Sequence, residues 1–358
     1  MRPITVAAVG DIMLGDSAIC VGWGFHSRWP GARAREALDS AVSLFRDVDL
    51  VMGNLETVVA ASGSGGTRWQ REQMWAEPSA TSALAELGIH VLSVANNHAI
   101  QHGPEAFEQT VQSLESAGIV VAGRRGEAPW VCAPVVVERG ELTIGVLAYC
   151  WRPRQYGNKE PPFAEGQVES VSSDIQRLRR RCTHVVVSLH WGDEFYEQPS
   201  VTQVGMARSL VDAGACLVIG HHPHVLRPVE RYRSALIAYS LGNFVSDMVW
   251  LPEARLGAAL NVELLQSGAC GADRLAFVET TSDFRISVTH GAAPALHNDG
   301  IPDVEYEKIV AGSVRRQRML AYRYALRNSY RYPKAILLEL VLRTIRNKLL
   351  AVMRRSDT

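Results

Sequence analysis

GHHPHV, at residues 220–225, directly follows the apolar run Cys216–Ile219. A short run without polar alternation predicts a strand buried on both faces, as in a parallel sheet covered by helices. His221, His222 and His224 come where this strand ends. In open α/β sheets, the carboxyl ends of the strands form the ligand crevice. The stretch therefore predicts an α/β protein with a polar site at its strand ends.

The same pattern recurs along the chain, because other apolar runs also end in polar residues. Runs end in Gly10-Asp11, Gly53-Asn54-Leu55-Glu56, Asn96-Asn97-His98, His190-Trp191-Gly192 and Gly242-Asn243. Helical stretches alternate with these runs, which predicts sheets covered by helices. The expected strands are Ile4–Val9, Leu50–Met52, Val91–Val94, Ile119–Ala122, Val135–Val137, Ile144–Ala148, His184–Leu189, Cys216–Ile219 and Ile237–Tyr239, with further strands over Leu264–Val288. The expected helices are Ala34–Phe45, Ser79–Leu87, Pro104–Ala117, Val171–Arg181 and Gln203–Asp212.

Carboxylates, amides and imidazoles dominate these strand ends, with little Lys or Arg. Neutral His together with Asp or Glu is the donor set of a transition-metal site. The i, i+2 spacing of His222 and His224 on an extended segment points both rings to one side, as two ligands of one centre require. Taken alone, Asp11 could cap a turn and Asn97 could fill a left-handed turn position. Neither a G-x-G-x-x-G nor a P-loop pattern occurs, so no dinucleotide site is expected.

Six motifs, in chain order, carry a resemblance to a known family. They are GDIMLG at 10–15, NLETV at 54–58, ANNH at 95–98, HWGDEFYEQPS at 190–200, GHHPHV at 220–225 and YSLGNFV at 239–245. This series resembles the bacterial capsule-synthesis family (CapA, poly-γ-glutamate) of the calcineurin-like metallophosphoesterases, over about residues 4–250. The resemblance implies an α/β fold, a four-layer α/β/β/α sandwich with a metal site at the strand ends. It also implies divalent metal ions as cofactors, two of them, with Mn, Fe and Zn as the candidates.

The resemblance also gives roles to individual residues. The metal ligands that it implies are Asp11, Asn54, Glu56, Asn97, His190, His222 and His224. Among them, Asn54 and Glu56 fall at the segment that usually supplies the bridging ligand. His98 matches the histidine that acts on the leaving group, and Glu194 is a further polar residue characteristic of the family.

Three positions depart from the expected patterns. Met13 stands where general phosphoesterases have a His, and Asn54 stands where they have the bridging Asp. Gln101 stands where the family usually has an Asp. Loss of that Asp weakens the support expected for a ligand or catalytic His, and His102 is the candidate to replace part of it.

The resemblance implies a metal-dependent hydrolase acting on a phosphoester or a related bond, in capsule or poly-γ-glutamate-type polymer synthesis. Two alternatives stay open: an amide-bond transferase or hydrolase acting on a γ-glutamyl or peptide-like product, and a non-catalytic assembly subunit. The expected substrate is a small molecule or an anionic polymer. For the polymer, Arg152, Arg154 and Lys159 could form a cationic entrance with Glu194 as a further substrate contact, and a plain solvated loop is the alternative.

The charges of the chain cancel, with 37 Lys+Arg against 37 Asp+Glu. The distribution is uneven, because residues 305–358 contain 13 Lys/Arg and 4 Asp/Glu. This segment predicts a basic helical tail at 303–358, after a CapA-like domain at 1–290. Its second half carries an apolar stripe at Leu338, Leu342, Ile345, Leu349 and Val352.

The stripe could dock onto the body or a second subunit, or contact an anionic membrane surface. Nucleic acid is not an expected partner, because the body carries no supporting motif. No window of about 18 residues is free of charge and no signal peptide is recognisable, so we expect a cytoplasmic protein, with peripheral membrane contact open. The six cysteines form no C-x-x-C pair and are expected to be buried reduced thiols.

Overall fold

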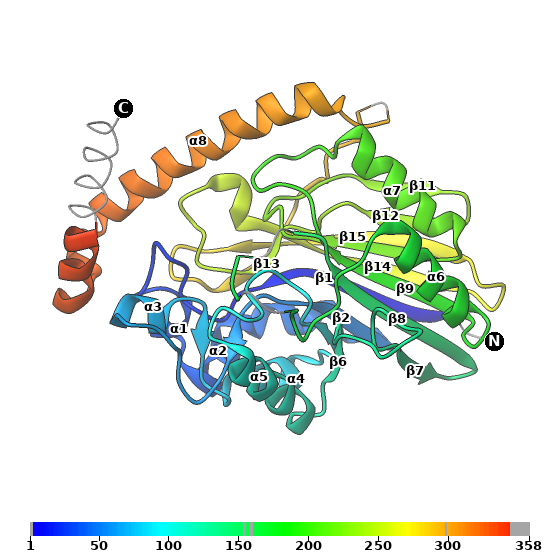
Figure 1. Cartoon of the computed structure of the whole chain (residues 1–358), viewed down its shortest axis with the longest axis horizontal. Coiled ribbons are helices and arrows are strands. Elements are labelled where there is room, and N and C mark those ends of the chain that lie inside the picture. The colour runs from blue at the N-terminus through cyan, green and yellow to red at the C-terminus, as the bar shows by residue number, and fades with distance from the viewer. Residues whose placement is uncertain (1–2, 153–154, 158–159, 298, 344–358) are drawn as a thin grey trace.

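The computed structural model describes residues 3–152, 155–157, 160–297 and 299–343, and two mixed β-sheets form its centre (Figure 1). The first sheet has the order β16-β15-β14-β1-β2-β5-β6, with β13 paired to β1, and the second has the order β11-β12-β10-β9-β8-β7. The strands of the first sheet are β1 Ile4–Ile12, β2 Leu50–Leu55, β5 Val91–Ser93, β6 Val120–Ala122, β13 Asn243–Val245, β14 Leu256–Leu264, β15 Cys270–Thr280 and β16 Ile286–Thr289. Those of the second are β7 Val135–Arg139, β8 Leu142–Cys150, β9 His184–His190, β10 Leu217–His221, β11 Val229–Tyr232 and β12 Ala235–Ala238. The short strands β3 Val58–Val59 and β4 Trp75–Ala76 pair separately.

Strand β9 shows why these runs are apolar throughout, since all its residues are buried. Val186 belongs to the core that contains the facing residues of both sheets. Val185 and Val187 belong to a second core, formed with the helices on the outer face. Alternate side chains of one strand therefore fill two different cores, as the period of two in a strand requires.

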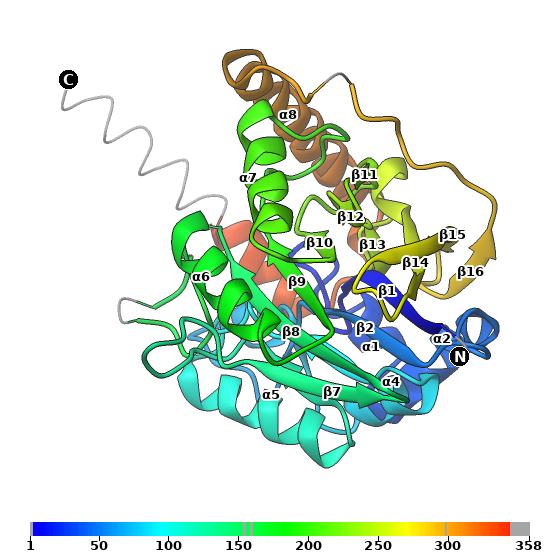
Figure 2. The same ribbon diagram turned by 90° about the vertical axis from the view of Figure 1, so that its right-hand side faces the viewer.

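Helices cover the outer face of each sheet, which gives four layers (Figure 2). On the first sheet lie α2 (Ala34–Leu38), α4 (Ala80–Leu87) and α5 (Pro104–Ser116), and on the second lie α6 (Val168–Arg179) and α7 (Val201–Asp212). A local hydrogen bond defines the start of α7, where the Ser200 hydroxyl accepts from the Gln203 amide. The predicted α/β/β/α sandwich is confirmed.

Some predicted boundaries differ from the structure. The expected helix over Ala34–Phe45 is a short α2 followed by a 3-10 helix at Asp39–Leu44. The expected strands over Leu264–Val288 are confirmed by β15 and β16. The helices α1 (Phe25–Arg28) and α3 (Arg68–Glu72) and strands β3, β4, β11 and β13 were not expected, because elements of two to five residues carry too little periodicity. The nine-residue strand β14 was not expected either.

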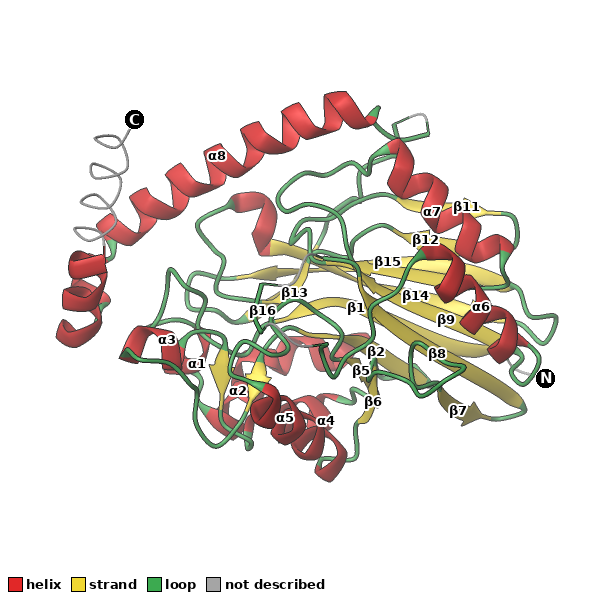
Figure 3. Ribbon diagram, in the orientation of Figure 1, coloured by secondary structure: helices red, strands yellow, loops and turns green. Residues whose placement is uncertain are grey.

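The basic tail is helical where the structure describes it. Helix α8 (Asp303–Arg327) forms a long rod along one side of the molecule (Figure 3), and Tyr306 and Ala321 are its buried residues. A 3-10 turn at Ser329–Arg331 and helical residues 334–343 follow. The division into 1–290 and 303–358 remains a prediction, although β16 ends at Thr289 and α8 begins at Asp303.

Residues 334–343 contact the body through a different face from the predicted stripe. Ile336 is fully buried and packs with Val21, and Leu340 joins this cluster beside Trp69. Leu338 is 59% exposed and Leu342 is 56% exposed. The prediction that the stripe docks onto the body is therefore wrong for these two residues. The other three residues of the stripe, Ile345, Leu349 and Val352, lie outside the described residues, and a membrane or subunit contact remains a prediction.

The cysteines follow the expectation, since all six are free and buried. Within the described ranges, none of the helices is both long enough and apolar enough to cross a bilayer.

Gly10 lies where β1 passes closest to the segment that leads into β13. The Asp11 amide donates a hydrogen bond of 2.9 Å to the Gly242 carbonyl oxygen. A Cβ added to Gly10 would lie 2.1 Å from that oxygen and 2.8 Å from the carbonyl oxygen of Leu241. Only glycine permits this approach, which fixes the backbone immediately before Asp11.

We therefore expect Gly10→Ala to lower the free energy of unfolding by about 3 kcal/mol, the upper end of the usual cost of overpacking. The matched control is Gly205→Ala in α7, where an added Cβ meets nothing within 4 Å. That change should raise the stability by roughly 0.5–1 kcal/mol, because alanine is the better helix former. Denaturant unfolding measures both, and equal effects of the two changes would contradict the prediction.

Candidate metal centre

The polar strand ends of both sheets meet at one place. In the first sheet, Asp11 on β1 pairs in register with Asn54 on β2. In the second, His190 on β9 pairs in register with His221 on β10. These four side chains are buried. The carboxyl ends of neighbouring parallel strands share an edge, and the face-to-face packing of the sheets brings the two edges together.

Asp11 is the anchor of one half of the site. Its Oδ1 accepts a hydrogen bond of 2.8 Å from Asn54 Nδ2 and lies 3.2 Å from His221 Nδ1. Its Oδ2 accepts a hydrogen bond of 3.0 Å from the His222 amide and lies 3.6 Å from His224 Nδ1. This carboxylate therefore links β1, β2 and the loop after β10.

Glu56 is the centre of the other half. Its Oε1 lies 3.4 Å from His190 Nε2, 3.8 Å from His98 Nε2 and 3.9 Å from His224 Nε2. Glu56 is fully buried, and neither of its carboxylate oxygens has a hydrogen-bond partner. A buried carboxylate without partners is costly unless a cation or a proton compensates it.

His222 and His224 converge on the site, as predicted, but not through extended backbone. His222 has φ 92° and His224 has φ 57°, so both occupy the left-handed region. Their ring centroids lie 5.8 Å apart. The predicted i, i+2 strand geometry is therefore wrong, because a tight turn brings the rings together instead. Such backbone is rare for residues other than glycine and is concentrated at functional sites.

Hydrogen bonds connect the remaining predicted ligands. His190 Nε2 lies 2.6 Å from Asn97 Oδ1 and 3.1 Å from His222 Nδ1. His222 Nε2 and Asn97 Nδ2 are buried and have no partner. The structure thus brings all seven predicted ligands, Asp11, Asn54, Glu56, Asn97, His190, His222 and His224, into one contiguous cluster.

The donor atoms fit a divalent metal. Ligand atoms of Asp11, Glu56 and His190 all lie within 4.8 Å of one another, and so do those of Glu56, His222 and His224. Oxygen and imidazole donors of this kind suit transition metals. The unpartnered oxygens of Glu56 and the unpartnered Nε2 of His222 are free to serve as ligands. Both triads contain Glu56.

Burial sets the protonation of the site in the free protein. It raises the pKa of Glu56 well above its usual value, and the charges of Asp11 and Glu194 add to this effect. Burial likewise lowers the pKa of His190 to about 3 and that of His222 well below its usual value. The two imidazoles are therefore neutral near pH 7, which is the form that binds metal.

For Asp11 and His224, the neighbouring side chains outweigh the effect of burial on the pKa. Burial opposes ionisation of Asp11, but its hydrogen bond with His221 and the charges of the surrounding histidines lower its pKa overall. Burial also opposes protonation of His224, but the charges of Glu56 and Asp11 raise its pKa overall. The free cluster thus favours an ionised Asp11, and it favours protonation of His224 more than water would.

His98 lies at the edge of the cluster, where its side chain retains 17% exposure. Burial lowers its pKa to about 4. Its Nδ1 lies 2.7 Å from Gln101 Oε1, so an Nδ1–H donates to this amide and leaves Nε2 directed towards the centre. Gln101 therefore orients the ring in place of the usual Asp. His102 does not replace it, because its ring nitrogens contact Ser64 and Gln73 instead.

The predicted substrate contacts are partly placed. Glu194 raises the pKa of His224 and therefore lies within electrostatic range of the centre. Arg152 donates to the Gly192 carbonyl oxygen and, at 3.0 Å, to Asp193 Oδ1. Arg154 and Lys159 lie outside the described residues.

No role was predicted from the sequence for His221 or Asn243. His221 faces Asp11 across 3.2 Å, and Asn243 Oδ1 lies 2.9 Å from His224 Nδ1. Asn243 also donates to the Ala254 carbonyl oxygen, which fixes its orientation. Both residues belong to the quoted motifs GHHPHV and YSLGNFV, so position at a strand end was the available signal.

The fold and the site define an α/β/β/α sandwich protein with a candidate metal centre at its strand ends. The family model described as "Bacterial capsule synthesis protein PGA_cap" matches residues 5–248. The chain therefore belongs to this family.

The chain is also similar to individual relatives and to solved structures. The chain is 27% identical over 270 residues to the PGA biosynthesis protein CapA of Bacillus subtilis (strain 168), covering 74% of this chain and 69% of that protein. It is 27% identical over 256 residues to the capsule biosynthesis protein CapA of Bacillus anthracis, covering 69% of this chain and 61% of that protein. Among solved structures, it is similar to a novel phosphatase of Mycoplasma pneumoniae, with TM-score 0.49, 12% identity and coverage of 78% of this chain and 94% of that chain.

A second pair of buried carboxylates, Asp16 and Asp247, lies beyond the ends of β1 and β13. Asp16 accepts hydrogen bonds from Ser27 and from the Gly22 amide. Asp247 Oδ2 accepts from the Ser17 amide, and its Oδ1 has no partner. Burial, with the charge of Asp16 adding to it, raises the pKa of Asp247 to about 7.

This shift predicts a pH-dependent stability that Asp247→Asn removes. From the ordinary pKa of 3.8 up to about 7, the unfolded chain releases the proton while the folded chain keeps it. The contribution of Asp247 to the free energy of unfolding of the wild type therefore falls as pH rises through this window. The stability of the variant relative to wild type should grow by roughly 1.4 kcal/mol per pH unit there and level off above it.

Denaturant unfolding between pH 4 and pH 8 measures the difference. Asp47→Asn is the matched control, since this carboxylate is exposed, and its difference from wild type should stay nearly flat. A flat difference for Asp247→Asn would show that Asp247 is ionised in the folded chain throughout.

Proposed function

We propose that this chain is a metal-dependent hydrolase that cleaves a phosphoester or a related bond in the synthesis of a capsule polymer. The observation that carries the proposal is Glu56. Its two buried, unpartnered carboxylate oxygens lie among His190, His224 and His98. Such an arrangement is unfavourable in the free protein and is relieved by a bound cation.

The chain's own residues would hold two divalent ions. Asp11, Glu56 and His190 offer one set of ligands, and Glu56, His222 and His224 offer another. The Asn97 amide oxygen lies against His190 and adds a neutral donor. A bound ion of this kind polarises a phosphoryl oxygen and lowers the pKa of a coordinated water to about 7.

His98 would handle the proton of the leaving group. Gln101 holds its Nδ1–H, so Nε2 is the atom that gains and loses a proton on the side of Glu56. In the free protein the ring is neutral, because burial lowers its pKa to about 4. A bound anionic substrate would favour the imidazolium, which could then protonate the leaving oxygen.

The place of the reaction in capsule synthesis rests on the family and on the names of the relatives. Those names point to a polymer product but leave the bond open. A screen of the purified protein should therefore test generic phosphoesters beside γ-glutamyl oligomers. Turnover of the oligomers alone would replace the phosphoester proposal by amide chemistry, and inertness towards both would support an assembly role without catalysis.

We expect wild-type protein to retain divalent metal through gel filtration, and Glu56→Gln to lose most of it. The change keeps the shape of the side chain but removes the anionic oxygens that both ligand sets share. Elemental analysis gives the metal content, and a thermal shift on adding a chelator should be large for wild type and small for the variant. Glu105→Gln, on the exposed side of α5, is the control and should behave like wild type. Equal metal content in Glu56→Gln and wild type would contradict the proposal.

We expect His98→Asn to lower kcat on an accepted substrate by about 100-fold or more, the usual contribution of a positioned acid or base. Metal content should stay unchanged, because His98 lies outside both ligand sets. Steady-state kinetics with metal analysis of the same preparation measures both. His290→Ala, an exposed histidine, should leave both quantities unaltered. Full turnover in His98→Asn would remove this residue from the mechanism.

A further inference from the structure

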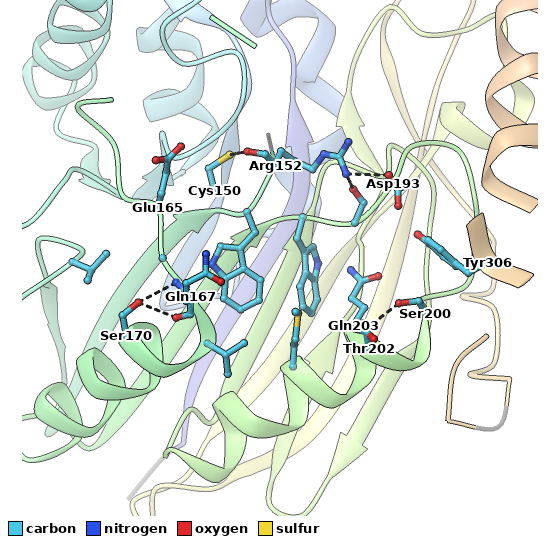
Figure 4. Close-up of a pocket in the computed structure, with 17 residues that line it drawn as sticks. Cys150, Arg152, Glu165, Gln167, Ser170, Asp193, Ser200, Thr202, Gln203 and Tyr306 are labelled. Atoms are coloured by element: carbon cyan, nitrogen blue, oxygen red, sulfur yellow. Dashed lines mark hydrogen bonds and ion pairs between the residues drawn. The ribbon is translucent and has the colours of Figure 1, made fainter. Parts of the chain in front are cut away.

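A cavity of about 780 Å³ lies beside the metal centre, on the helical side of the second sheet (Figure 4). The ends of β8 and β9 line it, together with the first turns of α6 and α7 and one residue of α8, Tyr306. A cavity of this size lies within the range of volumes at which proteins bind small organic molecules. None of the predicted metal ligands lines it.

The wall of the cavity is continuous with the metal centre. Trp191 lines the cavity and directly follows the candidate ligand His190. Trp151 also lines it, and its amide donates a hydrogen bond of 2.9 Å to the His190 carbonyl oxygen. Arg152 is a third lining residue, and it donates a hydrogen bond to the carbonyl oxygen of Gly192, two residues after His190. The cavity therefore adjoins the strand end that carries the candidate ligand His190.

Three lining residues have N–H groups that lack acceptors. Trp151 Nε1, Arg152 Nε and Gln203 Nε2 are buried from solvent and have no hydrogen-bond partner. Gln203 is only 7% exposed, and its Oε1 is already occupied by Arg227 Nη1 at 2.8 Å. Buried donors are normally satisfied in proteins, so their concentration along one cavity indicates a ligand that brings acceptors.

A buried guanidinium strengthens the preference for an anion. Arg227 is fully buried behind this wall, and its hydrogen bonds go only to uncharged oxygens, those of Asp193 and Tyr196 carbonyls, the Gln203 amide and the Tyr306 hydroxyl. In the described part of the chain, no carboxylate forms an ion pair with it. By contrast, Arg152 is paired with Asp193. A buried charge without a counter-ion favours an oxyanion nearby.

Apolar groups form much of the remaining lining, which also includes polar side chains and two carboxylates, Glu165 and Asp193, of which Asp193 is paired with Arg152. Trp151 and Trp191 meet edge to face with ring centroids 5.9 Å apart, and Val168 and Met206 extend this surface. Indole faces and aliphatic side chains suit a flat or hydrocarbon group. The ligand should therefore combine an oxyanion with an apolar body.

We propose that this cavity is a binding subsite for the remote part of the substrate, and that it takes an organic anion. The oxyanion would accept from the Trp151 indole, Arg152 and the Gln203 amide, and its apolar body would lie against Trp151 and Trp191. The substrate class is thus a molecule with a second anionic group beyond the bond that is cleaved. This role rests on the proposed function, but anion binding itself does not require metal.

Three small probes test the proposal on the full-length protein. Hippurate offers a carboxylate on a flat acyl body, phenyl phosphate offers a phosphate on an aromatic ring, and hippuramide is the uncharged match of hippurate. The indole N–H resonance of Trp151, assigned with Trp151→Phe, reports occupancy of the cavity, and titration gives each affinity. We expect at least one of the two anions to bind about 10-fold or more tighter than hippuramide, and their comparison identifies carboxylate or phosphate as the preferred group. Equal binding of all three, or binding that leaves this resonance unmoved, would overturn the proposal.

Variants then locate the contacts. Gln203→Glu keeps an acceptor for Arg227 but replaces the free N–H by a negative charge, so anion affinity should fall about 10-fold or more while the fold is retained. Trp151→Phe keeps an aromatic face but removes the indole N–H together with part of the ring, so it should weaken anions more than hippuramide. Gln112→Glu adds the same charge on the exposed face of α5 and should change nothing. Unaltered affinity in both Gln203→Glu and Trp151→Phe would also overturn the proposal.

The subsite and the proposed function can fail separately. The titrations are repeated with chelator present and in His222→Ala, where anion binding to the cavity should persist. Binding without any metal uptake or turnover would retain the subsite and reject the hydrolase. Metal uptake and turnover with no preference for the anionic probes would retain the hydrolase and reject the subsite.

Discussion

The burial of Glu56 without a hydrogen-bond partner is the constraint on which the site depends. An isolated carboxylate in a protein interior must be protonated, paired or bound to a cation. In the free chain, burial raises the pKa of Glu56, and the charges of Glu56 and Asp11 raise that of His224. The surrounding architecture keeps this unfavourable group in place, which is expected where strain is resolved by a ligand.

Two sheets are needed to hold that group in position. The first supplies Asp11 and Glu56 from the ends of β1 and β2, and the second supplies His190 from β9 and His222 from the turn after β10. Neither sheet alone carries both the acidic and the imidazole donors. The hydrogen bond from the His222 amide to Asp11 Oδ2 crosses between them, so the packing of the sheets and the geometry of the site are determined together.

The apolar runs with polar ends were sufficient to predict sheets covered by helices and a polar site at the strand ends, whereas the four layers and the full ligand set came from the family resemblance. The sequence was not sufficient for the local geometry. The left-handed backbone of His222 and His224 has no signature in residue type, since these positions lack glycine. The role of Gln101 was also misjudged: an amide oxygen can orient an imidazole as a carboxylate does, although it adds no charge. The cavity at Trp151 and Gln203 was missed because its lining residues come from separate elements and share no motif.

The segment His190-Trp191-Gly192 joins two sites with opposite electrostatic requirements. On one side, His190 faces the carboxylate of Glu56 at the candidate metal centre. On the other, Gly192 lies against Arg227 and Gln203, where a Cβ would come within 2.8 Å of Nη1 and 2.9 Å of Nε2. The proposed cation and anion sites therefore adjoin neighbouring residues of one buried strand end. A substrate that bridges them would neutralise the guanidinium while placing its reactive bond at the centre, so each contact would lower the electrostatic cost of the other.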